Sequence, residues 1–210
     1  MRIRITFAKN GALRYVGHLD LHKMWERIAR RAGLSLAYSQ GFHPQPKIQL
    51  AAALPLGFSS RCELVDLWVE TEADLARLPA NLQTAVPPGL KILEVIGVDE
   101  KGPPLQIQIL FTEYEVALPA EQDPEGLARK IESILDASSL PRERRGKAYD
   151  LRPLIEALEL IESNSPGNTR LFMRLSAREG ATGRPEEVLD ALSVPLDGAH
   201  VERTRLIFKG

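Results

Sequence analysis

Three of the chain's four histidines lie in or between two short stretches that are rich in basic and aromatic side chains. The first stretch is YVGHLDL at residues 15–21, and the second is YSQGFHPQPK at residues 38–47. Gly41 permits a sharp turn, while Pro44 and Pro46 stiffen the chain, so the second stretch predicts a rigid loop. A stiff loop that shows an aromatic ring, a histidine and a lysine can stack on bases and contact phosphates, as RNA recognition requires.

The segment between these stretches predicts an amphipathic helix over residues 21–32, with Asp20 as its N-cap and Gly33 at its end. Its polar face carries lysine and arginine, which suit phosphate contacts. Two alternatives stay open for the region: a surface that docks another protein, and a structural loop with Phe42 inside the core. The candidate RNA-binding residues here are Arg14, His18, Lys23, Arg27, Arg30, Arg31, Tyr38, Gln40, Phe42, His43 and Lys47.

A second basic cluster begins after residue 141. Arginine outnumbers lysine in it, which favours planar contacts with phosphate or base. The alternative is a solvated connector between a helix and a strand. The candidate RNA-binding residues of this cluster are Arg144, Arg145 and Lys147.

Metal binding and catalysis find less support in the residues. His18 and His22 are four apart and could share a helix face with His43 or Asp20 as a third zinc ligand. If Asp20 is the N-cap, however, His18 precedes the helix and the spacing loses its meaning. HExxH, GxSxG and P-loop motifs are absent from the sequence, so we expect no metal, no cofactor and no catalytic residue. A metal-independent ribonuclease that uses His18 or His43 is an alternative.

The charge of the chain is strongly segregated. The net charge of −1 combines +7 in residues 1–50 with −9 in residues 51–140 and +1 in residues 141–210. Such segregation favours one basic surface for an anionic partner, or else two blocks that face each other in the fold. The single cysteine, Cys62, allows no internal disulfide, and no apolar run approaches the length of a membrane helix, so a cytoplasmic protein without membrane contact is expected.

The hydrophobic patterns predict an α+β fold. The expected strands cover residues 2–8, 34–38, 48–54, 64–70, 90–98, 105–118, 147–160, 169–177 and 200–208, with an extended piece at 12–16 and helices at 21–32, 71–82, 124–135 and 184–192. This order predicts two ferredoxin-like (βαββαβ-type) halves in tandem, residues 1–98 and 105–210, joined by a linker at 99–104. An unrelated α+β arrangement with one larger sheet is the alternative.

The motifs YVGHLDL, YSQGFHPQPK and LPLG (residues 54–57), with RRGKAYDLRPLI and RPEEVLDAL in the second half, resemble the bacterial family of radical SAM-linked proteins. The resemblance implies a separate radical SAM enzyme as partner. The chain lacks a CxxxCxxC triad and so cannot hold the iron–sulfur cluster of that chemistry itself. We therefore expect a non-catalytic RNA-binding accessory protein that acts with such an enzyme in RNA or ribosome modification. A protein-docking adaptor without nucleic-acid contact is the alternative from another class.

Overall fold

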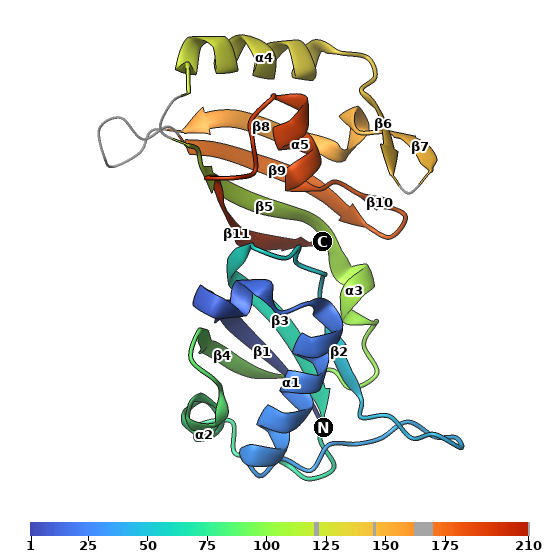
Figure 1. Cartoon of the computed structure of the whole chain (residues 1–210). Helices are drawn as coiled ribbons and strands as arrows, with labels where there is room; N and C mark the ends of the chain where they lie inside the picture. Colours follow the sequence, from blue (N-terminus) through green and yellow to red (C-terminus); the bar gives the residue numbers. More distant parts are fainter. Residues whose placement is uncertain (120–121, 145, 162–169, 210) are drawn as a thin grey trace. The chain divides into compact units, whose positions relative to one another are not determined.

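The computed structural model describes residues 1–119, 122–144, 146–161 and 170–209. Its backbone contacts divide the chain into two compact units, Met1–Ile109 and Leu110–Gly210 (Figure 1). Each unit combines α-helices with antiparallel strand pairs. The predicted mixture of helix and sheet is therefore confirmed.

The N-terminal unit follows the order strand, helix, two strands, helix, strand. Its elements are β1 (Arg2–Lys9), the 3-10 helix η1 (Gly11–Tyr15), α1 (His18–Arg31), β2 (Ile48–Leu50), β3 (Ser59–Trp68), α2 (Leu78–Ala85), β4 (Leu90–Val98) and α3 (Leu105–Gln108). The strands lie in the order β2-β3-β1-β4, and each neighbouring pair is antiparallel. The first strand of the chain therefore lies inside the sheet, between β3 and β4.

One face of this sheet forms the hydrophobic core. Ile3, Ile5 and Phe7 alternate along β1 and are fully buried, as period-two side chains on one face of a strand should be. Trp25 of α1 packs edge-on against Phe7, with 4.9 Å between ring centroids. Both α1 and α2 bury apolar residues in this core and contact each other, so they cover the same face of the sheet.

The opposite face of the sheet holds a buried charge cluster. The Asp66 carboxylate on β3 is fully buried and lies between two arginines of β1. Arg2 donates from Nε (3.0 Å) and Nη2 (2.6 Å) to Asp66 Oδ2. Arg4 donates from Nε to Oδ1 (2.8 Å) and from Nη2 to Oδ2 (2.9 Å). These four charge-assisted hydrogen bonds compensate for the loss of water around the carboxylate.

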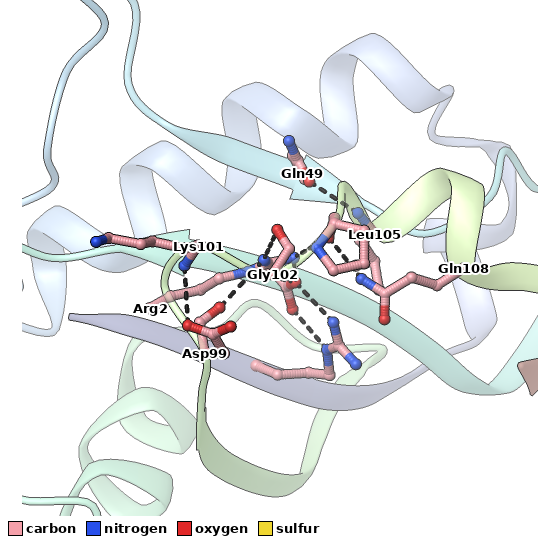
Figure 2. Close-up of polar contacts among 10 residues, drawn as sticks. Arg2, Gln49, Asp99, Lys101, Gly102, Leu105 and Gln108 are labelled. Carbon is pink, nitrogen blue, oxygen red and sulfur yellow. Dashed lines mark hydrogen bonds and ion pairs between the residues drawn. The ribbon is translucent and has the colours of Figure 1, made fainter. Parts of the chain in front are cut away.

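Arg2 also fixes the segment that follows β4, as Figure 2 shows. Its guanidinium donates to the backbone carbonyls of Asp99 (3.3 Å), Gly102 (3.0 Å) and Pro103 (3.1 Å). A few residues later, the Leu105 backbone N–H donates to Gln49 Oε1 on β2 at 2.9 Å. The expected linker at 99–104 is thus held on the sheet of the N-terminal unit by side chains of β1 and β2.

The C-terminal unit repeats the general order with two insertions. Its elements are β5 (Ile109–Ala117), α4 (Pro124–Asp136), β6 (Pro141–Arg144), β7 (Lys147–Asp150), the 3-10 helix η2 (Arg152–Leu154), β8 (Ile155–Ile161), β9 (Arg170–Arg178), β10 (Ala181–Thr182), α5 (Pro185–Ala191) and β11 (His200–Phe208). In its sheet β9 lies next to β5, and β5 next to β11. Both β8 and β10 pair with β9, whereas β6 and β7 form a separate hairpin.

The β6–β7 hairpin is attached to α5 by an ion pair. Arg144 donates from Nε and Nη2 to the two carboxylate oxygens of Glu187, each at 2.9 Å, and its guanidinium lies 5.1 Å from the Tyr149 ring centroid. Burial, the largest single influence, would raise the pKa of Glu187, but the hydrogen bonds and charge of Arg144, together with Tyr149 and Arg184, hold that pKa below its usual value. Burial, with the Glu187 carboxylate beside it, raises the pKa of Tyr149 to about 12.

Several sequence-based boundaries were wrong. The 3-10 helix η1 occupies Gly11–Tyr15, where an extended piece was expected at 12–16, and residues 105–108 form α3 before the strand. The region 34–38 contributes isolated bridges at Leu36 and Tyr38, and the helix expected at 71–82 spans Leu78–Ala85. The strand expected at 147–160 is split by η2, because Pro153 cannot donate to a sheet. Thr169, the first residue of another expected strand, lies outside the described residues.

The N-cap of α1 is Gly17, and Asp20 lies in the first turn of the helix. An acidic residue there stabilises the positive end of the helix dipole without capping it. The expectation that His18 precedes the helix was therefore wrong, since α1 begins at His18. Within the described ranges, no helix is long and apolar enough to span a bilayer.

The buried charge cluster predicts a large stability loss on removing its anion. In Asp66→Ala the Arg2 guanidinium, whose side chain is 1% exposed, loses its counter-charge. We expect the free energy of unfolding to fall by about 3–5 kcal/mol, measured by urea denaturation. Asp74→Ala is the matched control, because its ion pair with Arg77 is exposed and should contribute less than about 1 kcal/mol. Equal losses in both variants would contradict the role given to Asp66.

The contacts of Arg144, Tyr149 and Glu187 at the β6–β7 hairpin predict a tyrosine with a raised pKa. An ultraviolet titration of the protein, minus that of Tyr149→Phe, should show a phenol that ionises near pH 12, above the ordinary value of about 10. Because the unfolded state releases this proton first, the contribution of Tyr149 to stability should fall as the pH rises from 10 to 12. Glu187→Gln should shift the ionisation to lower pH, since it removes the neighbouring negative charge. Ionisation near pH 10 in the folded protein would contradict this assignment.

Candidate nucleic-acid interface

The stretch YSQGFHPQPK forms a narrow loop that projects from the N-terminal unit (Figure 1, light blue). Its base is attached to the end of β3, because Ala37 N donates to Trp68 O at 2.7 Å and Trp68 N donates to Lys47 O at 3.1 Å. Above the base, Ser39 N donates to Gln45 O, and Gln45 N donates back to the Ser39 hydroxyl. The two arms of the loop are therefore held together up to its tip.

The tip of this loop exposes its side chains. Phe42 has 102% of its reference surface accessible, and Tyr38 has 47%. Gln40, His43 and Lys47 are exposed as well. The alternative in which Phe42 fills the core was wrong. Single apolar side chains are common on protein surfaces, so the exposure makes the Phe42 ring accessible to a partner and does not by itself assign a role to it.

A pocket of about 370 Å³ lies at the base of the loop, beside the edge strand β2. Its lining comprises Ser39, Gln45, Pro46, Lys47, Ile48, Gln49 and Trp68. The Trp68 indole is supported by the Arg2 guanidinium, which lies 4.6 Å from the ring centroid. Lys47 is the one charged residue of the lining, so the pocket favours an anion or a polar ring over a cation.

The polar face of α1 carries four exposed cations, namely Lys23, Arg27, Arg30 and Arg31. Within residues 1–119, 122–144, 146–161 and 170–209, none of the four forms an ion pair with a carboxylate. We call these four side chains the α1 stripe. Like charges three and four residues apart destabilise a helix slightly, and an anionic partner would relieve that repulsion.

The basic block at the N-terminus is only partly available to a partner. Arg2 and Arg4 share the single carboxylate of Asp66, which belongs to the acidic block of the sequence, so both guanidinium groups are engaged within the fold. Lys9 is 1% exposed and donates from Nζ to Val16 O at 3.1 Å. The charges left on the surface are thus mainly the α1 stripe and Lys47.

The stretches YVGHLDL and LPLG lie side by side at the start of α1. Gly57 N donates to Arg14 O at 2.9 Å, and the Arg14 guanidinium lies 5.6 Å from the ring centroid of Tyr15. Tyr15, Leu19 and Leu56 are exposed at 66%, 76% and 61%. Arg14 itself is half-buried, so it is a weaker phosphate-binding candidate than the α1 stripe.

The histidines have separate surroundings. His18 opens α1, His22 Nε2 lies 3.3 Å from the Ile48 carbonyl oxygen of β2, and His43 is exposed on the loop. His18 and His22 share a helix face at the expected spacing. Even so, no group of three His, Cys, Asp or Glu side chains in the described chain is arranged to hold a metal ion.

The residues of the second basic cluster differ in whether they are paired with an acid. Arg144 is committed to its bidentate ion pair with Glu187, and Arg142 lies 3.9 Å from Asp190. Lys147 is exposed, while Arg145 lies outside the described residues. A phosphate would have to compete with Glu187 for Arg144, so this hairpin is a weaker candidate than the α1 stripe.

Sequence reasoning missed Trp68 and Gln49 as possible contact residues. The alternation LVDLWVE placed Trp68 on the same strand face as Asp66, but it gave no sign that the ring would reach a pocket at the sheet edge. Gln49 pairs opposite Asp66 and lies on the same face of the sheet. A tryptophan on the polar face of an alternating strand is the signal that could have pointed there.

Comparisons with known proteins give one informative match. A search of curated proteins found no match, and a solved structure of a proposed glycine cleavage system transcriptional repressor aligns over 99% of this chain and 98% of its own, with 10% identity and a TM-score of 0.28. A family model matches residues 2–185, which include both stretches of the loop and helix region. The chain therefore belongs to the bacterial family described as "Uncharacterized protein conserved in bacteria (DUF2344)".

Proposed function

We propose that the protein is a non-catalytic RNA-binding accessory protein. The observation that carries the proposal is the α1 stripe: four exposed cations on one helix face without a carboxylate partner in the described chain. Phosphates would be held by the stripe and by Lys47. The loop residues Tyr38, Gln40, Phe42 and His43 would contribute stacking and hydrogen bonds to unpaired bases.

The position of each cation along α1 separates a structural role from a binding role. Arg30 and Arg31 lie in the last turn, where positive charge complements the helix dipole and stabilises the fold. Lys23 and Arg27 lie mid-helix and receive no such benefit. Their presence as an exposed i, i+4 pair of like charges is therefore better explained by an anionic partner.

The same proposal includes two further elements. Each unit would be a ferredoxin-like βαββαβ domain, supported in the N-terminal unit by the antiparallel order β2-β3-β1-β4 and in the C-terminal unit by the neighbours of β5 and β9. The partner would be a separate radical SAM enzyme acting on RNA or the ribosome. Only the resemblance of the motifs supports this part of the proposal. Fold does not by itself assign this activity.

RNA affinity should fall steeply with salt. Filter binding of a labelled single-stranded RNA across a salt series measures the number of phosphates contacted, because each contact adds about −0.7 to the slope of log K against log salt. If the α1 stripe and Lys47 all engage, the slope should be about −3.5. Absent binding at low salt, or affinity that stays flat across the series, would overturn the proposed function.

The double variant Lys23→Glu/Arg27→Glu should weaken RNA binding without unfolding the protein, because both side chains point into solvent. We expect the salt slope to become shallower by about 1.4, the share of two phosphate contacts. The matched control is Lys91→Glu/Lys209→Glu, which makes the same charge change at two exposed positions outside the α1 stripe and the loop, one on β4 and one after β11. Equal weakening in both variants would indicate a general charge effect and contradict a specific role for the stripe.

The protein-docking alternative predicts a different result. Its strongest support is the fully exposed Phe42, which could insert into a protein groove as well as stack on a base. Co-purification of the radical SAM partner that survives nuclease treatment, together with no RNA affinity in the salt series, would favour the adaptor. Nuclease-sensitive co-purification would favour a ternary assembly on RNA.

A further inference from the structure

We infer that the pocket at the base of the loop receives one nucleobase of a bound single-stranded RNA, with the adjoining phosphate on Lys47. This inference rests on the proposed function and adds a defined subsite to it. Its volume of about 370 Å³ lies within the range of small-ligand sites. Such a size suits a single nucleotide and excludes a duplex.

The chemistry of the lining favours a nucleotide. Trp68 supplies an aromatic surface for stacking, and Lys47 supplies the one positive charge. Gln45 and Gln49 supply primary amides, groups that can pair with the donors and acceptors of a base edge. The lining contains no carboxylate, so nothing in it repels a phosphate.

Gln49 is oriented before any ligand arrives. Its Oε1 accepts from the Leu105 backbone N–H at 2.9 Å. This bond turns the amide oxygen toward Leu105. Its Nε2 donates no hydrogen bond within the described chain and points away from Leu105 in Figure 2. The remaining donor suits an acceptor on a base, such as a ring nitrogen or an exocyclic oxygen.

The Trp68 ring is also held in place before a ligand binds. The Arg2 guanidinium lies over it at 4.6 Å and is itself held by Asp66 and by three backbone carbonyls. The hydrogen bonds of Arg2 in this network all go to protein groups. Arg2 therefore contributes to the pocket by supporting the Trp68 ring. A ring and an amide fixed in advance lose little conformational entropy when a base binds.

The loop supplies continuity between this pocket and the exposed tip. Lys47 ends the loop arm that begins at Phe42. The two arms are joined by the backbone bond from Ser39 N to Gln45 O and by the bond from Gln45 N to the Ser39 hydroxyl. A strand with one base in the pocket could therefore extend along the loop toward Phe42, a second stacking surface. Unpaired bases tolerate such stacking whatever their identity.

Indole resonances test the inference directly, because the chain has only two tryptophans. In a ¹H–¹⁵N spectrum of the full chain, the Nε1–H signal that Trp68→Phe removes should shift when 5′-AMP, 5′-UMP or a single-stranded oligoadenylate or oligouridylate is added. The Trp25 indole is fully buried in the core and should stay in place as an internal control.

The matching affinity measurement uses the same RNA. Trp68→Ala should weaken binding by about 5- to 150-fold, the range expected for losing one stacked base, while Trp68→Phe should restore most of it. Lys47→Ala should reduce the salt slope by about 0.7, and Lys91→Ala should leave it unchanged. Should Trp68→Ala fail to fold, the indole shift in the unmodified protein and the Lys47 comparison still decide the matter.

The possible failures are distinguishable. Salt-dependent RNA binding with a silent Trp68 indole would overturn the pocket and leave the proposed function standing. Absence of any RNA affinity would overturn both, even if mononucleotides alone moved the indole. A shift produced by an acidic or proline-rich peptide and by no nucleotide would reassign the pocket to protein docking and overturn the inference.

Discussion

The Asp66 carboxylate is the constraint on which the N-terminal unit depends. A fully buried anion is stable only with its hydrogen bonds complete, and Arg2 and Arg4 supply four of them. Arg4 lies directly opposite Asp66 in the β1–β3 register. A slip of one residue would move the carboxylate to the apolar face, so the charge cluster sets the register of the two strands.

Through Arg2, the same cluster reaches the candidate interface. The guanidinium that neutralises Asp66 also supports the Trp68 ring and fixes the segment after β4. The scaffold and the pocket are therefore linked by one side chain. By contrast, the α1 stripe has no such link, because α1 uses Trp25 on its buried face for the fold and leaves its basic face to solvent.

Local patterns in the sequence predicted most of the longer strands and helices and a rigid loop at residues 38–47, but they left the pocket unpredicted. Alternation in residues 2–8 predicted β1, and the glycine and prolines of residues 38–47 predicted a loop, while the position of Phe42 in solvent or in the core stayed open. The start of α1 was misjudged because an acidic side chain suits both the N-cap and the first turn. The pocket could not be predicted because Arg2 and its carbonyl partners are about a hundred residues apart in the sequence. No local pattern contains such a contact.

That separation also bears on how the chain is made. Since β1 lies between β3 and β4, β1 leaves the ribosome before both neighbours and has no partner on either side until each of those strands has been synthesised. The Arg2 side chain obtains its anion only after residue 66 has emerged, and its last carbonyl only after residue 103. A nascent chain shorter than this therefore carries a cation and an apolar strand edge without their final neighbours, the condition in which incomplete domains rely on chaperones.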